Sequence, residues 1–327
     1  MRHLKKLPVV LAIAGLILAT LLVGVYGFGR IANAMLSVGA PGFALFCAWQ
    51  LLVITILGSA WRAIAPVTRM RALAIFVWGR MVRDSAASCL PFTQVGGFVL
   101  GARAVTLHGI SQSVATISTV VDITAEFATE ILFAAGGLLI LLGHTSNRAI
   151  AVPAEIGVGI ALIAAAAVLW LQRGIVPILT RLGRGILGSW LKNDGSARAE
   201  ISEAELATMY GDTGRLASGA ALHLLGWIGK GVGNWIAFWL LGSNVGLMEA
   251  LAIEGLLHVL LATVVLVPGY AGVQEAGYMG LGALFGVPPE VSLGVSLIRR
   301  ARDITIGVPI LLIWQILEMR RLGNVPP

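Results

Sequence analysis

The 327-residue sequence is poor in charged residues and in cysteine, and both shortages narrow the classes of protein that it can encode. Charged residues make up 12% of the chain and hydrophobic residues 57%, whereas a soluble domain is typically about 25% charged. Lipid is therefore the expected solvent for most of the chain. The two cysteines, Cys47 and Cys89, lie in or beside apolar stretches, so they predict buried thiols and no disulfide framework.

The sequence also lacks the motifs of the common catalytic sites. It has no P-loop, no nucleophile elbow and no H-E-x-x-H motif, and its histidines show no metal-ligand spacing. Glu254 and His258 share a helix face, but two residues fall short of the usual ligand number of a zinc site. We therefore expect no enzyme activity, no metal and no cofactor.

Long apolar runs fill much of the chain and predict membrane-spanning helices. A bilayer core of about 30 Å needs roughly 20 apolar residues per helix, and the runs lack the alternation of barrel strands. The expected fold class is an all-α polytopic membrane protein with about six to eight transmembrane helices. The candidate spans are Leu7–Phe28, Phe43–Trp61, Gln112–Gly143, Val152–Leu171, Leu216–Gly242, Ala250–Val267 and Val291–Leu317.

Basic residues cluster between the apolar runs, where the positive-inside rule places them in the cytoplasm. Lys5 and Lys6 precede the first run, the segment Arg173–Arg215 is rich in arginine, and Arg320 and Arg321 follow the last run. The net charge of +7 therefore indicates a membrane surface and no nucleic-acid partner. We expect a multi-pass protein of the bacterial inner membrane with both termini in the cytoplasm.

Two segments, Arg80–His108 and Val267–Pro289, are apolar but interrupted by glycine, proline and charged residues. Such backbone is tolerated at membrane depth where it is buried in protein or lines a wet cavity, so both segments are predicted to be re-entrant or broken helices. Pro91 of the first segment lies as far before Gly109 as Pro268 of the second lies before Gly286. This match favours an internal duplication, and paired broken segments are typical of a transporter site.

The duplication predicts three parts in the chain. Residues 1–172 form the first membrane half, residues 173–215 a cytoplasmic linker, and residues 216–327 the second half. The linker is too short for an ordinary domain. Its residues from Ile175 to Trp190 are predicted to form an interfacial helix, and Ser202 with Glu205 predicts a second short helix through a capping box. The pattern leaves open whether the halves are inverted or parallel.

Charged side chains also lie within the predicted spans, where they are costly and normally face the bundle interior. Asp122 and Glu126 share one face of a predicted helix. We expect these carboxylates to lie within salt-bridge or water-bridged reach of Arg299, Arg302 or Lys230, because unpaired charges at that depth cost several kcal/mol. Such pairs either line a polar cavity for a lipid headgroup or serve only to hold the helices in register.

Part of the sequence resembles a known family. Val267–Ala276 reads VPGYAGVQEA and is followed by FGVPPE from Phe285, which resembles the P-G-G-x-G-x-x-E-A and G-V-P signature of the membrane region of lysylphosphatidylglycerol synthases. Leu90–Gly97, together with Val121-Asp122, resembles an earlier signature of that superfamily. The second glycine of the P-G-G pattern is replaced here by Tyr270-Ala271. The similarity covers nearly the whole chain and is closest to the membrane protein encoded with hopanoid-biosynthesis genes.

The resemblance implies a lipid-flippase fold. In the full-length synthases, amino-acid transfer belongs to a cytosolic acyltransferase-like domain, whereas this sequence ends at Pro327 soon after the last predicted span. We therefore expect no synthase activity.

The favoured hypothesis is a lipid translocase or lipid-binding transporter, for a hopanoid or a related isoprenoid lipid. The alternative is a non-transporting scaffold for lipid-modifying enzymes, and a membrane-embedded enzyme is the least favoured. The expected partners are membrane lipids and, on the alternative, lipid-biosynthesis enzymes; the oligomeric state stays open. The predicted substrate-binding residues are Gln94, Gly96, Gly97, Asp122, Glu126, Lys230, Gly272, Gln274, Glu275, Arg299, Arg302 and Asp303.

The charge pattern predicts the topology directly. Single cysteines placed at Arg184 and at Arg321 should react with a membrane-impermeant maleimide only after the inner membrane is permeabilised, because both positions lie in arginine-rich segments. Labelling of either position from the periplasmic side of intact cells would reverse the orientation.

Overall fold

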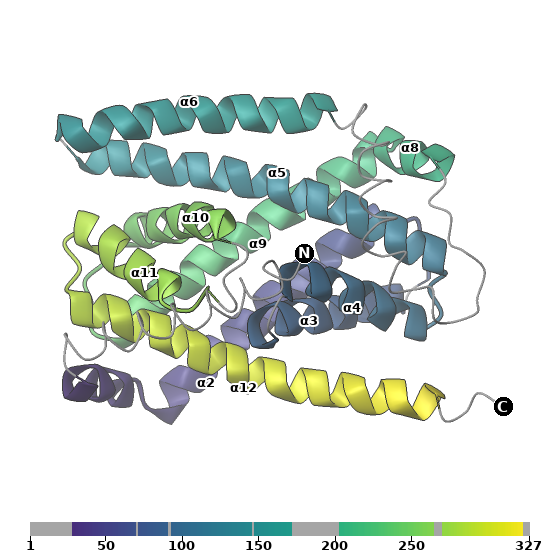
Figure 1. Ribbon diagram of the computed structural model, residues 1–327, viewed down its shortest axis with the longest axis horizontal. Coiled ribbons are helices and arrows are strands. Elements are labelled where there is room, and N and C mark those ends of the chain that lie inside the picture. Colours follow the sequence, from purple (N-terminus) through teal and green to yellow (C-terminus); the bar gives the residue numbers. More distant parts are fainter. Residues whose placement is uncertain are drawn as a thin grey trace, which may run out of the picture.

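The computed structural model describes residues 28–69, 71–90, 93–145, 147–171, 203–264 and 270–322. Within these ranges the chain is all α-helical, with ten helices and no strand (Figure 1). The predicted all-α class is thus confirmed. The helices are α2 (Phe28–Ile64), α3 (Ala72–Cys89), α4 (Thr93–Leu107), α5 (Gln112–His144), α6 (Arg148–Leu171), α8 (Glu203–Gly211), α9 (Thr213–Leu240), α10 (Leu247–Thr263), α11 (Val273–Leu284) and α12 (Pro289–Leu322).

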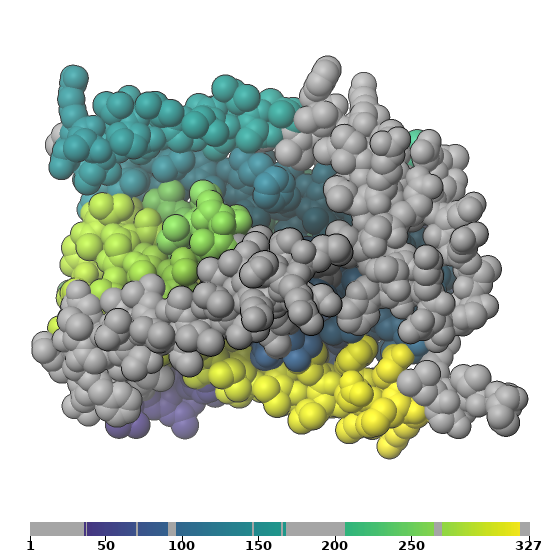
Figure 2. Space-filling model, viewed as in Figure 1, coloured from purple at the N-terminus to yellow at the C-terminus, as the bar shows by residue number. Residues whose placement is uncertain are grey.

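The long helices frame the molecule and the short helices fill its middle. In Figure 1, α5 and α6 run side by side near one edge, and α12 runs along the opposite edge. Figure 2 shows α6 and α12 on the surface at these two edges. Two pairs of shorter helices, α3–α4 and α10–α11, lie between α5 and α12, and α2 and α9 cross behind them.

Helices α2 and α9 are antiparallel. They pack closely because the face of α9 that contacts α2 carries glycines. A Cβ atom added at Gly219 would lie 2.5 Å from Ile64, and one added at Gly226 would lie 2.3 Å from Leu57. Further along, the indole nitrogen of Trp49 donates a hydrogen bond to the carbonyl of Gly229 over 2.8 Å. Small residues at such interfaces let helix backbones approach within van der Waals contact, which is how helices associate in lipid.

The two segments predicted to be broken each form part of a helical hairpin: Arg80–His108 covers the end of α3 and all of α4, and Val267–Pro289 contains α11, whose hairpin partner α10 was predicted as a separate span. Helix α3 ends at Cys89 and α4 begins at Thr93, while α10 ends at Thr263 and α11 begins at Val273. The partners of each hairpin pack against each other. At 1.5 Å per residue, α4 and α11 are about 22 Å and about 18 Å long, which is less than the ~30 Å core of a bilayer.

Both hairpins end in the same kind of turn. Gly109 follows α4 with φ of 87° and Gly286 follows α11 with φ of 72°. In each turn the next residue donates back to the last helical turn, Ile110 to Val105 over 3.4 Å and Val287 to Gly282 over 2.9 Å. Glycine adopts this left-handed conformation without steric cost, which accounts for the matching glycines in the two segments.

Two helical segments in the described part of the chain, Val38–Ile64 and Gln112–His144, are long and apolar enough to cross a membrane. Six of the predicted spans overlap described helices, whereas Leu7–Phe28 lies almost wholly outside the described residues. Large apolar side chains are exposed along the outer helices: Ile163 of α6 is 72% exposed and Leu312 of α12 is 59% exposed. An apolar surface of this kind is typical of contact with lipid or another apolar partner.

The helices of the two predicted halves share one core. Helix α2 packs on α9, α5 on α10, and α12 on α3. One buried cluster joins Val38 and Phe46 of α2 to Phe238 of α9, Leu257 of α10 and Tyr278 of α11. The division into halves therefore remains a prediction about the sequence, and it does not describe two separate folding units.

The predicted linker is described only in part. Helix α8 (Glu203–Gly211) lies where a second short helix was expected, while Ser202 and the expected interfacial helix from Ile175 to Trp190 lie outside the described residues. Both cysteines are free, as expected, but each is only partly buried.

Close contact between helix backbones predicts which glycines the protein needs for its stability. Gly58→Ala should lower the melting temperature clearly, because the new Cβ would lie 2.6 Å from the Cα of Val77 and would force α2 and α3 apart. Gly136→Ala in α5 is the matched control, since no atom lies within 4 Å of its added Cβ and alanine is favoured over glycine in helices by about 1 kcal/mol. Thermal unfolding of both variants in the same detergent is the measurement. Equal melting temperatures would contradict this packing.

Candidate functional site

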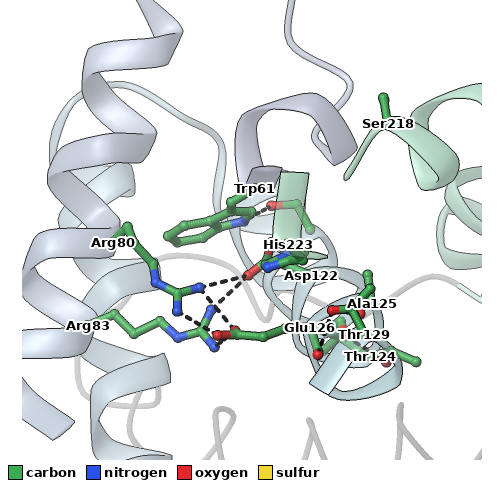
Figure 3. Close-up of polar contacts among 12 residues, drawn as sticks. Trp61, Arg80, Arg83, Asp122, Thr124, Ala125, Glu126, Thr129, Ser218 and His223 are labelled. Carbon is green, nitrogen blue, oxygen red and sulfur yellow. Dashed lines mark hydrogen bonds and ion pairs between the residues drawn. The ribbon is translucent and has the colours of Figure 1, made fainter. Parts of the chain in front are cut away.

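Four charged residues form a buried cluster between α3 and α5 (Figure 3). Arg83 places Nη1 2.7 Å from Oδ2 of Asp122 and Nη2 2.5 Å from Oε2 of Glu126. Arg80 places Nη2 2.6 Å from Oε1 of Glu126. All four side chains are buried. Two guanidinium groups and two carboxylates thus neutralise one another, as charges within a membrane normally do.

Helix α9 adds a histidine to this cluster. Nε2 of His223 lies 2.8 Å from Oδ1 of Asp122, and both side chains are fully buried. Nearby, the indole nitrogen of Trp61 donates to the hydroxyl of Ser118 over 3.0 Å. The cluster therefore links α3, α5 and α9 through polar contacts, and the Trp61–Ser118 hydrogen bond joins α2 to α5 beside it (Figure 3).

The carboxylates of α5 are buried and paired, as the sequence predicted, but their direct ion-pair partners are not the residues that were predicted. Arg299, Arg302 and Lys230 were expected, whereas the arginines come from α3. The reason is spatial: the α3–α4 hairpin lies between α5 and α12 and reaches the carboxylates first (Figure 1). The interrupting charges of the first broken segment are thus the ion-pair partners of the acidic helix.

A second cluster joins α10, α11 and α12. Arg299 donates through Nη1 to both carboxylate oxygens of Glu254, over 2.8 Å and 2.6 Å. The same nitrogen donates to the hydroxyl of Tyr278 over 2.8 Å. His258 lies between two carboxylates, with Nε2 3.1 Å from Glu254 and Nδ1 3.5 Å from Glu130 of α5. This network connects the second hairpin to both long helices.

Three further contacts hold Arg300 and Arg302 of α12. Arg300 places Nε 2.5 Å from Oε1 of Glu275, which is buried on α11. The guanidinium of Arg302 donates to Asp303, its neighbour in the chain, over 2.8 Å. It also lies over the ring of Phe46, 4.8 Å from the centroid. Successive arginines of one helix therefore face different partners.

These clusters line a cavity of about 520 Å³. Six cationic side chains and four carboxylates face it, together with His258. Apolar side chains at its border, Phe127 and Ile304, are 48% and 58% exposed. The cavity thus combines a charged wall with an apolar rim. Its charged lining residues are Arg80, Arg83, Asp84, Glu126, Glu130, Lys230, Arg299, Arg300, Arg302 and Asp303.

Half of the predicted site residues line this cavity, and the others that the structure describes do not. Asp122 and Glu275 lie behind the wall, paired with arginines that face the cavity. The predicted residues that line the cavity are Glu126, Lys230, Gln274, Arg299, Arg302 and Asp303.

The predicted glycines do not line the cavity. A Cβ atom at Gly97 would lie 2.6 Å from the carbonyl oxygen of Arg83, so Gly97 serves the packing of α4 on α3. Gly96 has open space around its Cα, and Gly272 begins α11 with φ of 75°. The side chain of Gln94 lies outside the described residues.

Several residues of the cavity were missing from the predicted site. A signal for the arginines and aspartate of α3 was present, since charges within an apolar segment usually mark function. No sequence pattern could place the residues of α10 and α12 beside them, because those contacts depend on how the helices pack. The residues missed are Arg80, Arg83, Asp84, Glu130, His258, Tyr270 and Arg300.

The α3–α5 cluster predicts a large difference between two glutamates of α5 that lie one turn apart. Glu126→Gln should destabilise the protein by roughly 3–5 kcal/mol, because two buried guanidinium groups lose their shared carboxylate. Glu130→Gln should change stability by less than about 1 kcal/mol, since its partner His258 and its own side chain are partly exposed. Chemical unfolding in the same micelle measures both, and equal losses would contradict the role assigned to Glu126.

Comparison with known proteins gives one match. No curated protein and no solved structure is significantly similar to the chain. Residues 9–311 match the family described as the transmembrane (TM) region of lysylphosphatidylglycerol synthase, as the two sequence signatures predicted. This match covers most of the 327 residues, and the chain therefore belongs to this family of membrane proteins, which is linked to lipid handling.

Proposed function

We propose that this protein binds a membrane lipid by its headgroup in the cavity between the hairpins and moves that lipid across the bacterial inner membrane. It would act as a flippase-like transporter and catalyse no covalent chemistry. The observation that carries the proposal is the cavity of about 520 Å³ with a charged wall inside an apolar helical protein. This size is within the range of sites that hold small molecules.

The border of the cavity suits a lipid better than a free solute. A headgroup needs polar partners, whereas the acyl chains need an apolar path that continues into the bilayer. The exposed side chains of Phe127 and Ile304 provide such a path beside the arginines. A lipid could therefore place its headgroup inside while its chains stay in hydrocarbon.

The arrangement of the helices supports an internal repeat. Helices α2, α3, α4 and α5 of the first half would correspond to α9, α10, α11 and α12 of the second. Under this correspondence the packing pairs match: α5 packs on α10 as α12 packs on α3, and α5 packs on α9 as α12 packs on α2. Each hairpin also ends in a positive-φ glycine before its long helix.

The corresponding helices run in opposite directions. In Figure 1, α5 starts beside α4 at the right and ends at the left, whereas α12 starts beside α11 at the left and ends near the C-terminus. Helices α2 and α9 are likewise antiparallel. We therefore infer an inverted repeat, with the two hairpins as re-entrant elements and about six to eight crossings in total. Inverted repeats with a site at their interface are typical of alternating-access transporters.

The transported lipid is a further part of the proposal. The resemblance to membrane proteins encoded with hopanoid-biosynthesis genes makes a hopanoid or a related isoprenoid lipid the first class to test. The charged wall favours members of that class that carry a polar, ionisable headgroup. The cytoplasmic placement of both termini belongs to the same proposal.

A non-transporting scaffold for lipid-modifying enzymes is the second candidate. The observation that favours it is the extent of ion pairing, since Glu126, Glu254 and Glu275 each already contact an arginine. Paired charges can hold helices in register without any ligand. Transport measurements separate the two candidates.

The test is lipid translocation in reconstituted vesicles. The wild type should speed the exposure of a fluorescent phospholipid or hopanoid analogue to dithionite added outside. Ala262→Trp should slow this rate at least about tenfold, the change produced by ~1.4 kcal/mol added to the barrier, because Ala262 lines the cavity. Thr263→Trp is the matched control, since the adjacent Thr263 is exposed and is not part of the lining.

The outcomes distinguish the candidates. Equal rates for Ala262→Trp and the wild type would place the translocation path elsewhere. A wild type that moves none of these lipids, although it is folded and inserted, would favour the scaffold.

A further inference from the structure

Lys230 differs from the other cations that line the cavity. Each of the five arginines there has a carboxylate within ion-pair distance. In the described part of the chain no carboxylate lies within 4.0 Å of Lys230. Its ammonium lies over the ring of Trp227, with Nζ 3.8 Å from the centroid.

The contact with Trp227 leaves the ammonium incompletely satisfied. A cation–π contact uses the charge of the ammonium and the face of the ring, whereas the three N–H donors of lysine each seek an acceptor. Charges at membrane depth are retained where they face a wet cavity or a functional partner. The donors of Lys230 therefore have the contents of the cavity as their available acceptors.

Trp227 holds this ammonium in place. The indole is 2% exposed. Its ring stacks on Phe133 of α5 with centroids 6.1 Å apart, and it forms a T-shaped pair with His258 of α10, with centroids 4.6 Å apart. Three helices thus fix the ring under Lys230. The position of the ammonium is set before any ligand arrives, which lowers the ordering cost of binding.

Lys230 also lines a second cavity in addition to the large one. A second, smaller cavity of about 30 Å³ is lined by Lys230, Asn234, Arg299 and Arg302, and all of these except Asn234 also line the large cavity. The amide oxygen of Asn234 is buried without a hydrogen-bond partner among the described residues. The smaller space is large enough for a water molecule, which could donate to Asn234 and accept from a cation.

The charges around Lys230 favour an anionic ligand over a cationic one. The carboxylates on other helices whose charge reaches Lys230 are already engaged: Glu126 and Asp84 by Arg80, and Glu130 by His258. Glu254, which lines the smaller cavity together with Lys230, is engaged by Arg299. A cationic headgroup would have to displace these pairs and would meet Lys230 itself. An anionic group would meet Lys230 with its donors unused.

We propose that Lys230 binds the phosphate, or a similar anionic group, of the lipid headgroup, so that the substrates are lipids with an anionic group next to the apolar chains. This inference rests on the proposed function. Lys230 supplies the charge, Trp227 fixes its position, and Arg299 and Arg302 are neighbouring cations that also line both cavities. The carboxylates behind the wall keep the arginines in place and do not contact the lipid.

The experiment measures lipid binding to the purified full-length protein by native mass spectrometry. The probes are dioleoyl phosphatidylglycerol and dioleoylglycerol, which share acyl chains and differ in the phosphoglycerol group. Lys230→Gln and Lys230→Met should each weaken phosphatidylglycerol binding by roughly 10-fold to 100-fold, as expected for one lost hydrogen bond to a charged group. Diacylglycerol binding should not change, and Lys230→Arg should retain most of the phosphatidylglycerol affinity.

Arg320→Gln is the matched control, because it removes one positive charge at an exposed position outside the cavity lining. It should leave both affinities unchanged. Inorganic phosphate at millimolar concentration serves as a competitor, and no displacement of the lipid is expected. Displacement by phosphate would mean that the site takes the free anion.

The remaining outcomes separate this inference from the proposed function. Wild-type affinity in a folded Lys230→Gln or Lys230→Met variant would overturn the role of Lys230. Equal wild-type affinity for the two lipids, with translocation intact, would overturn the anionic substrate class and leave the proposed function standing. A wild type that neither binds nor moves any lipid would overturn both.

Discussion

The arrangement of this protein depends on one constraint, which is that charges inside an apolar helical protein must find partners within the chain. Lipid cannot solvate them, so each arginine of α3 and α12 that lines the cavity is held by a carboxylate. Arg83 joins α3 to Asp122 of α5, and Arg299 joins α12 to Glu254 of α10. These pairs connect helices that are distant in the sequence. They fix the hairpins relative to the long helices more specifically than apolar contacts, which resemble the contacts that lipid itself offers.

The same ion pairs determine the charge of the cavity lining. The carboxylates Asp122, Glu254 and Glu275 lie behind the wall, and their arginines turn toward the open space. The arginines that line the cavity therefore belong to ion-pair clusters that are almost neutral as a whole. This pairing lowers the free-energy cost of burying so many charges in the membrane. Among the described residues Lys230 has no carboxylate at ion-pair distance; its ammonium lies over the ring of Trp227 and lines the cavity. The electrostatic design that stabilises the helices thus also leaves one cation available to a ligand.

Glycine has two separate roles in this architecture, and only one of them concerns conformation. Gly109 and Gly286 permit the left-handed turns that end the hairpins. Gly97 and Gly226 permit helix backbones to come together, since a Cβ atom at either position would overlap a neighbour. Most of the glycines that were predicted to belong to a ligand site are therefore explained by turns and by helix packing. The cavity is lined by side chains, and its shape follows from how closely those helices can approach.

The sequence by itself determined the class of the protein, because a low charge content and long apolar runs permit few structures other than a helical membrane protein. It also determined that Asp122 and Glu126 would be buried and paired, and its signatures predicted the family that the comparison confirmed. Only the tertiary structure decided which cations pair with which carboxylates. Charge spacing along one helix defines a face, but the partner depends on which hairpin lies beside that face. The choice of Arg80 and Arg83, and the isolation of Lys230, follow from the antiparallel packing of helices far apart in the chain.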